Sequence, residues 1–201
     1  MHEASRVPLG ENRGDTLVSR RLPGDEGVWL FITADSFMFT LFFSSFIYER
    51  TKNVALFNES QQALNPTIGA VNTVLLLSAS WFVVIAVGAA KRRLRNVLVP
   101  CLALAIACGG LFAGAKIFEY REKIAHGMTM LTNDFFMYYF MLTGLHFLHL
   151  IIGMIVLTVM LVKAQTSIEG DYLYYLESSA SYWHMVDLLW IMLFPLLYLV
   201  R

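Results

Sequence analysis

The stretch NDFFMYYFMLTGLHFLHLIIG, residues 133–153, decides the fold class of this chain. It is apolar enough and long enough to span a bilayer, yet it carries two histidines, His146 and His149. Polar side chains at that depth cost free energy unless they find partners, so they are candidates for a functional or architectural role. Two further apolar stretches also contain ionisable residues. We therefore expect a helical membrane protein with a small set of buried polar groups.

The composition of the whole chain agrees with a membrane location. Of the 201 residues 57% are hydrophobic, the formal net charge is zero and the mean hydropathy is +0.59. This is far more apolar than an ordinary soluble domain, and the charge balance predicts no nucleic acid as a partner. Cys101 and Cys108 lie seven positions apart in one expected helix. That spacing is roughly 10 Å along the helix, which is too far for a disulfide bond between them.

Five apolar segments are each long enough to cross the bilayer, which takes roughly 20 residues. A polar tail, residues 1–24, precedes them and lacks the apolar core of a secretory signal. Pro195 lies late in the last segment and is a candidate for a bend. The predicted fold is an all-α integral membrane domain over residues 25–201. Its five transmembrane helices are expected at about these ranges: 27–48, 66–90, 97–118, 134–162 and 182–200.

Basic residues set the expected orientation of the bundle. Lys91, Arg92, Arg93 and Arg95 cluster in the short connection between the second and third helices. Cytoplasmic loops carry an excess of lysine and arginine, so this connection is expected in the cytoplasm. Two crossings separate it from the arginine-bearing N-terminus, which is then cytoplasmic as well. Five crossings leave the C-terminus outside.

Several ionisable side chains are candidates for a buried polar network. On a helix, His146 and His149 lie on one face, and His184 and Asp187 are likewise three positions apart. Glu119 sits at the outer end of the third helix. A buried histidine that donates to a carboxylate satisfies both partners. We therefore expect these five side chains to meet in the interior as a hydrogen-bonded network.

Asp35 is a separate candidate in the first helix. It lies about eight residues, or roughly 12 Å, below the start of that helix. No basic residue adjoins it in the sequence. A carboxyl group at that depth is expected either to handle protons or to pair with a neighbouring helix or a lipid head group. A small proton-coupled transporter built on Asp35 is disfavoured, because no inverted repeat or pair of broken helices is evident.

The third apolar segment is rich in small residues. Gly110 and Gly114 form a small-xxx-small pair in it. Such a pair lets a neighbouring backbone approach closely. We therefore expect Gly110 and Gly114 to serve helix packing.

Metal or haem binding is the main alternative to a structural network. Three helix histidines, His146, His149 and His184, are few for haem or copper sites, which need imidazoles that converge from opposing helices. The sequence also has no phosphate-binding glycine loop, no nucleophile elbow and no His-Glu-x-x-His zinc motif. We expect no catalytic residue, metal or cofactor on this chain, which then acts as a subunit. The alternative is a self-sufficient membrane cytochrome b or redox enzyme that uses the three histidines.

Four stretches of the chain resemble subunit III of the haem-copper oxidases (cytochrome c oxidase), in its short five-helix form. They are VWLFITADSFMF (28–39), KIFEYREKIAHG (116–127), LTGLHFLHLIIG (142–153) and YWHMVDLLWIMLF (182–194). With the helices between them they cover nearly all residues after about Gly24. The most specific parts are the Thr-Gly-x-His-x-x-His and Tyr-Trp-His-x-Val-Asp-x-x-Trp motifs.

The resemblance implies a bundle with a V-shaped cleft that holds phospholipids, in the bacterial inner membrane. It implies a cofactor-free accessory subunit in electron transport, which docks on a catalytic subunit I that carries the haem and metal. The implied role is to support assembly, stability and proton uptake of subunit I and to protect its active site. The family carries a carboxylate, mostly Glu, in this first helix, and the matching residue here is Asp35. Its side chain is shorter, so any contact that depends on reach is affected.

Two further stretches resemble one branch of the family most closely. They are residues 63–84 and 133–149, which are similar to the branch associated with nitric oxide reductases, called NorE-like. The partner implied by this branch is a cytochrome-c-dependent nitric oxide reductase, with a supporting role in denitrification. A terminal oxidase that reduces oxygen is the other partner that the resemblance allows.

Overall fold

The computed structural model describes residues 25–166 and 170–200, and within them every regular element is a helix. Five helices are long and apolar enough to cross a membrane. The predicted all-α fold with five membrane-crossing helices is therefore confirmed. These helices are α1 (Glu26–Lys52), α3 (Pro66–Lys91), α4 (Arg95–Ala125), α5 (Asp134–Thr166) and α6 (Tyr172–Phe194). A short π-helix, η1 (Pro195–Leu199), continues α6 from Pro195, the residue at which a bend was expected.

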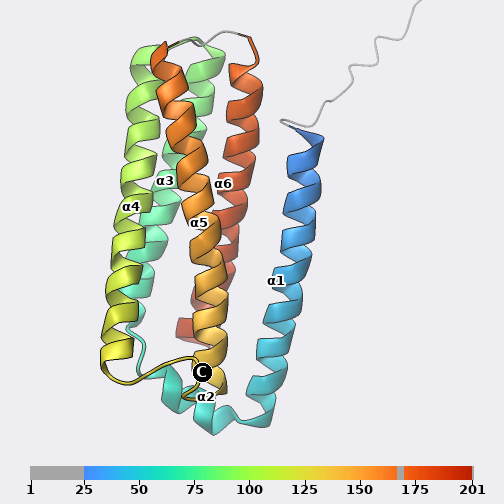
Figure 1. Ribbon diagram of the computed structural model, residues 1–201, viewed down its shortest axis with the longest axis vertical. Coiled ribbons are helices and arrows are strands. Elements are labelled where there is room, and N and C mark those ends of the chain that lie inside the picture. The colour runs from blue at the N-terminus through green and yellow to red at the C-terminus, as the bar shows by residue number, and fades with distance from the viewer. Residues whose placement is uncertain (1–24, 167–169, 201) are drawn as a thin grey trace, which may run out of the picture.

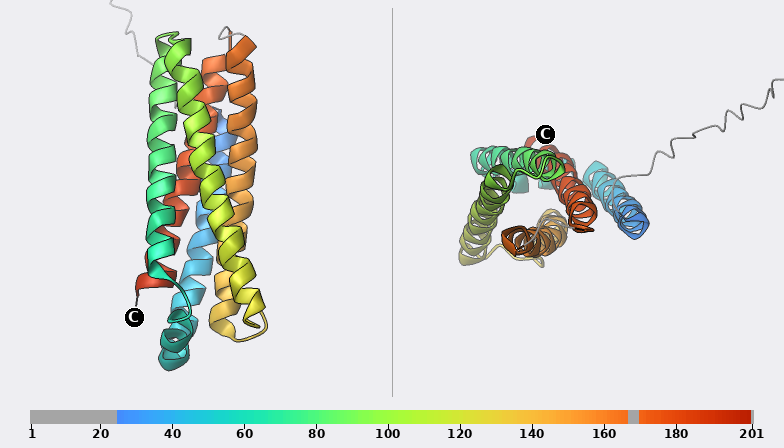
Figure 2. Two further views of the ribbon diagram at one scale, coloured as in Figure 1. Left: turned by 90° about the vertical axis from the view of Figure 1, so that its left-hand side faces the viewer. Right: turned by 90° about the horizontal axis from the view of Figure 1, so that it is seen from above.

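The helices alternate in direction and leave one of them at the edge. α3 packs against α4 and α6, and α5 packs against α4 and α6, whereas α1 contacts mainly α6 and α5 (Figures 1 and 2). In its most apolar window α1 is 11% buried, compared with 56% for α6 with η1. α6 is therefore the central helix, and α1 presents most of its surface outward.

The last crossing helix begins at Tyr172, whereas the sequence predicted Tyr182. The early part of α6 is polar in composition, but its serine hydroxyls are satisfied inside the helix: Ser178 donates to the carbonyl of Tyr174 at 3.0 Å. Leu176 is fully buried, and Tyr172 donates to the carbonyl oxygen of Met160 at 3.1 Å. The polar residues between Tyr172 and Tyr182 therefore belong to α6, because buried packing and local hydrogen bonds stabilise the helix there.

A short helix, α2 (Val54–Gln61), was not among the predicted elements. It closes the end of the bundle between α1 and α3. Its Phe57 ring lies 5.4 Å from Phe46 of α1 and 5.7 Å from Phe135 of α5, measured between ring centroids. The Gln61 side chain donates to the carbonyl oxygen of Leu197 at 3.1 Å. α2 thus ties α1, α5 and the C-terminal π-helix together.

Close helix packing occurs at glycines other than the predicted pair. Trp183 of α6 is fully buried, and a Cβ added at Gly109 or at Gly153 would lie 3.0 Å from its indole ring. At Gly114 an added Cβ meets nothing within 4 Å, and at Gly110 it meets only the end of the Met154 side chain, at 3.9 Å. The prediction for Gly110 and Gly114 is therefore corrected. Neighbouring residues point about 100° apart around a helix, and the small-residue pattern did not reveal which face turns inward.

We predict that Gly153→Ala lowers the stability of the folded chain by about 1–3 kcal/mol, the usual cost of over-packing a filled core. The added methyl group has to displace the buried Trp183 ring. The measurement is the midpoint of thermal unfolding of the detergent-purified chain. Gly144→Ala on the same helix is the matched control, since its Cβ meets nothing within 4 Å. Equal midpoints for the two variants would contradict this packing.

Candidate functional site

The first polar site joins α1 to α5 through Asp35 and His149. The Nε2 atom of His149 lies 3.2 Å from Oδ1 of Asp35, and both side chains are 12% exposed. The other ring nitrogen, Nδ1, lies 2.8 Å from the carbonyl oxygen of Leu145. A carbonyl oxygen can only accept, so Nδ1 carries a proton. The contact between Nε2 and Asp35 then needs one further proton, held either by the imidazole or by the carboxyl group.

Aromatic side chains surround the contact between His149 and Asp35. The rings of Phe31 and Phe39 lie 6.2 and 5.9 Å from the His149 ring, measured between centroids. Tyr182 of α6 donates to the carbonyl oxygen of His149 at 3.1 Å. Oδ2 of Asp35 is buried and has no hydrogen-bond partner within the part of the chain that the structure describes. Asp35 of α1 thus pairs with His149 of α5 among aromatic side chains, and its second carboxyl oxygen makes no hydrogen bond to the described residues.

The second site is a buried charge pair near the α2 end of the bundle. Lys116 and Glu119 of α4 form an ion pair at 2.9 Å, and their side chains are only 1% and 2% exposed. Lys116 also donates to the hydroxyl oxygen of Tyr198 at 2.8 Å, and that hydroxyl donates to Glu119 at 2.7 Å. The Lys116 ammonium group lies 4.9 Å from the centroid of Trp190, within range of a cation–π interaction. The π-helix η1 carries Tyr198, so it brings the C-terminal end of the chain onto this pair.

His146 forms neither a pair with His149 nor a contact with Glu119. It is fully buried between Phe112 of α4 and Trp190 of α6, with ring centroids 5.7 and 5.2 Å away. Neither of its ring nitrogens has a hydrogen-bond partner among the described residues. His146 therefore lies in the core between α4 and α6, while His149 turns towards α1.

The third site links α3 to α6. Nδ1 of His184 forms a hydrogen bond with the hydroxyl of Ser80 at 2.5 Å. Asp187 is 4% exposed, and neither of its oxygens has a hydrogen-bond partner among the residues that the structure describes. The predicted direct pair of His184 with Asp187 is therefore wrong. His184 bonds to Ser80 of α3 instead.

The single network expected from the sequence is divided into separate sites. His146, His149 and His184 contact Trp190, Asp35 and Ser80 respectively, so their rings do not converge on a common point.

Sequence reasoning did not assign roles to several residues that complete the sites. Lys116 had a usable signal, because a lysine three positions from Glu119 within an apolar segment is a candidate ion pair. Ser80 had a partial signal, because a hydroxyl in an apolar segment can hydrogen-bond to another helix, but its partner could not be named. Tyr198 had none, since its partners Lys116 and Glu119 lie on a different helix. Only the packing of the helices brings them together.

Comparisons with known proteins cover almost the whole chain. The family model for cytochrome c oxidase subunit III matches residues 18–200. Cytochrome c oxidase subunit 3 of Synechocystis sp. is 32% identical over 179 residues, which are 87% of this chain and 74% of the relative. Probable quinol oxidase subunit 3 of Staphylococcus saprophyticus is 21% identical over 175 residues, 87% of each chain. Heme-copper oxidase subunit I+III of Aeropyrum pernix is 27% identical over 182 residues, 86% of this chain but 22% of the relative.

We predict that Lys116→Met destabilises the chain strongly, by about 3–5 kcal/mol, because it leaves the Glu119 carboxylate buried and unpaired. The double variant Lys116→Met with Glu119→Gln removes both charges and should recover much of that loss. The measurements are the thermal midpoint and the yield of monodisperse protein in detergent. A double variant no more stable than Lys116→Met alone would show that the buried pair does not act as a unit.

Proposed function

The chain belongs to the cytochrome c oxidase subunit III family, and on that basis we propose that it is a cofactor-free accessory subunit of a respiratory haem-copper enzyme. Under this proposal a separate catalytic subunit I holds the haem and metal, and this chain supports its assembly, stability and proton uptake. The observation that carries the proposal is the family match over residues 18–200, which runs through all five crossing helices.

One relative supports docking on a subunit I in particular. The Aeropyrum pernix protein is named as subunit I+III, and this chain covers 22% of its length. Its name joins subunit I and subunit III in one chain. We propose the same association here, between two separate chains.

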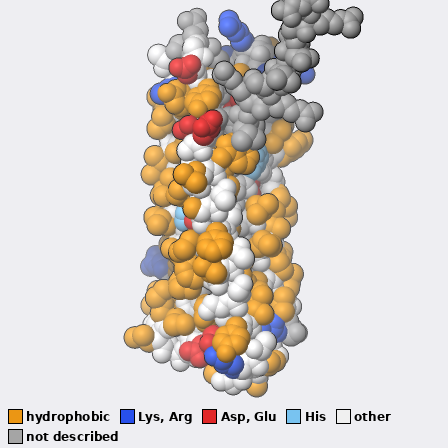
Figure 3. Space-filling model, turned by 90° about the vertical axis from the view of Figure 1, so that its right-hand side faces the viewer, with side chains coloured by type: hydrophobic (Ala, Val, Ile, Leu, Met, Phe, Trp, Pro, Cys, Tyr) orange, Lys and Arg blue, Asp and Glu red, His pale blue; other side chains and the backbone are white. Residues whose placement is uncertain are grey.

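The outward face of α1 is the surface that we propose for this docking. Leu30, Phe37 and Leu41 are 73%, 65% and 51% exposed within the chain. Hydrophobic side chains cover much of the face on which α1 lies, between charged groups near its two ends (Figure 3). In a bilayer such a face suits either lipid or another helical subunit, and α1 is the least buried of the five crossing helices.

The pair of Asp35 and His149 is the site that we propose for proton handling. We propose that one proton is held between the two groups, whose Nε2 and Oδ1 atoms lie 3.2 Å apart, and each side chain is 12% exposed. The pair is built on α1, so a partner docked on that helix would lie close to it. A partly exposed pair of this kind can exchange its proton with an adjacent subunit or with a water chain.

The orientation and the bound lipid are part of the same proposal. The start of α1 and the basic connection between α3 and α4 lie at one end of the bundle, while η1 lies at the other (Figures 1 and 2). We propose that the first end faces the cytoplasm of a bacterial cell and that phospholipids fill the V-shaped cleft expected for the family. At the opposite end, Arg50 lies beside Ile47, Val54 and Leu196 in a cavity of about 400 Å³. A cation above apolar walls suits an anionic phospholipid.

We further propose a nitric oxide reductase as the partner, because residues 63–84 and 133–149 resemble the branch associated with those enzymes. The similar proteins described above carry the names of oxidases, which makes an oxygen-reducing enzyme the competing partner. The two partners differ in substrate, so the reactivity of the purified complex towards nitric oxide and oxygen decides between them.

We predict that the tagged chain, purified gently from its native membrane, brings with it a larger haem-containing protein. After separation, the isolated chain should show no haem absorption in the visible spectrum. Haem that remains on this chain alone would contradict the accessory role. It would favour a cytochrome instead, and replacement of His146, His149 and His184 by alanine would then identify the ligands.

We predict that Asp35→Asn folds and inserts normally, because it removes a charge from an apolar pocket. The variant cannot hold the shared proton, so the partner enzyme should take up protons more slowly or lose activity faster during turnover. The measurements are steady-state turnover, proton uptake and the rate of inactivation of the complex. Glu49→Gln, near the other end of the same helix where Glu49 pairs with Lys52, is the control for loss of an acidic side chain. Unchanged kinetics in the Asp35→Asn complex would reduce Asp35 to a structural or lipid-binding residue.

A further inference from the structure

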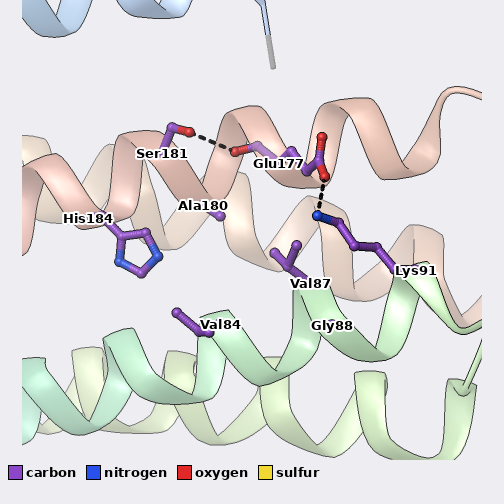
Figure 4. A pocket seen from close by; sticks show the side chains of 8 residues that line it. All are labelled: Val84, Val87, Gly88, Lys91, Glu177, Ala180, Ser181 and His184. Atoms are coloured by element: carbon purple, nitrogen blue, oxygen red, sulfur yellow. Dashed lines mark hydrogen bonds and ion pairs between the residues drawn. The ribbon is translucent and has the colours of Figure 1, made fainter. Parts of the chain in front are cut away.

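The connection between α3 and α4 carries arginines that have no acidic partner. α3 ends at Lys91 and α4 begins at Arg95, so the connection is very short. Lys91 pairs with Glu177 of α6 at 2.9 Å (Figure 4). Arg92, Arg93 and Arg95, which we call the basic turn, are exposed, and none of them forms an ion pair within the part of the chain that the structure describes. Their three guanidinium groups are therefore available to an anion.

The backbone of the basic turn requires a left-handed residue at position 93. The amide of Arg93 donates to the carbonyl oxygen of Ala90 at 3.0 Å, and the amide of Leu94 donates to that of Ala89 at 2.9 Å. This is the Schellman pattern of a helix C-terminus, in which the residue after the cap is left-handed and usually glycine. Arg93 occupies that place with a φ of 56°. A side chain costs free energy in this conformation, because its Cβ crowds the backbone.

The far end of α4 closes with the same pattern and does use glycine. The amide of Gly127 donates to Ile124 and the amide of Met128 donates to Lys123, both at 3.0 Å, and Gly127 has a φ of 76°. Among the described residues, Arg93 is the one non-glycine residue with a positive φ. Strained backbone of this kind is characteristic of functional sites. An arginine at position 93 is thus less favourable than glycine for the turn itself, and what it adds is a charged side chain.

Arg95 also occupies an unfavourable position. It is the first residue of α4, and the N-terminal end of a helix carries a partial positive charge that favours anions over cations. The first turn of α4 has no acidic side chain, and the cap residue Leu94 makes no side-chain hydrogen bond. The basic turn therefore places like charges beside one another and beside the positive end of a helix. A bound anion would offset this repulsion.

The basic turn lies where the head groups of a bilayer are expected. It joins two helices that are each long and apolar enough to cross a membrane, at one end of the bundle (Figures 1 and 2). So short a connection holds its side chains close to the surface of the hydrocarbon. Leu94 and Val97 lie next to the arginines in the sequence and are 48% and 40% exposed. Apolar side chains beside cations match the layer in which lipid phosphates lie above acyl chains.

We propose that the basic turn binds the phosphate group of an anionic phospholipid, with Leu94 and Val97 against its acyl chains. The planar guanidinium group matches a phosphate with two parallel hydrogen bonds, and this geometry suits arginine better than lysine. A lipid is favoured over an acidic segment of a partner protein, because the exposed apolar side chains flank the charges. The site lies at the opposite end of the bundle from the Arg50 cavity. It concerns this chain alone, so it stands whichever enzyme the chain serves.

The first test is native mass spectrometry of the full chain in detergent, titrated with phosphatidylglycerol or with phosphatidylcholine. All chains carry Arg50→Gln, so that the cavity at the other end does not contribute. We expect tighter binding of phosphatidylglycerol, weakened about fivefold by Arg95→Gln, which is the usual worth of one basic residue at an anionic surface. Arg121→Gln, an exposed residue near the other end of α4, is the matched control and should change nothing. Equal binding of the two lipids would overturn the proposal and favour an acidic protein segment.

The second test uses Arg93→Gly, which should move two measurements in opposite directions. Relief of the backbone strain should raise the thermal midpoint in phosphatidylcholine nanodiscs, whereas loss of the charge should weaken the binding of phosphatidylglycerol about fivefold. A residue with only a structural role in the turn would not separate the two. Binding as tight as in the unchanged chain would overturn the proposal. Stabilisation by inorganic phosphate alone, beyond a chloride control of equal ionic strength, would also overturn it and assign the basic turn to a soluble anion.

Discussion

Hydrocarbon supplies no hydrogen bonds, so each ionisable side chain within this bundle depends on a partner from its own or another helix. The chain meets that constraint for most of them with three separate polar sites, while His146 and Asp187 have no hydrogen-bond partner among the described residues. Asp35 and His149 join α1 to α5, Ser80 and His184 join α3 to α6, and Tyr198 brings η1 onto the Lys116–Glu119 pair of α4. These contacts fix which helix faces which, because a helix turned about its axis would leave a charge or an imidazole in lipid. The arrangement of the five crossing helices follows from that requirement together with packing against Trp183.

Much of this architecture could be predicted from the sequence, and the remainder shows where local patterns stop being informative. The lengths of the apolar segments identified five crossing helices. The ionisable residues within those segments, among them Asp35, His149, His184 and Asp187, were identified as candidates for buried polar sites. Their partners could not be predicted, since Ser80 and His149 meet His184 and Asp35 across helices that are far apart in the sequence. The early start of α6 was missed for a related reason. Its serine hydroxyls donate to carbonyl oxygens one turn earlier in the same helix. These hydroxyls are therefore less costly in the bilayer than their hydropathy values suggest.

The same geometry bears on function. Each helix histidine has a different neighbour, Trp190, Asp35 or Ser80. A chain of this kind suits a supporting role beside a larger catalytic subunit, as proposed for this member of the subunit III family. The least buried helix, α1, would then combine two tasks. It presents an apolar face to its surroundings and carries Asp35, the residue proposed to share a proton with His149.

The most direct test of this account is the structure of the complex purified from the native membrane, determined by electron cryomicroscopy. The account predicts a haem-bearing multi-helix subunit seated against α1, with no haem or metal density among His146, His149 and His184. Haem or metal density within this chain, coordinated by those histidines, would contradict the account and make the chain a redox protein in its own right.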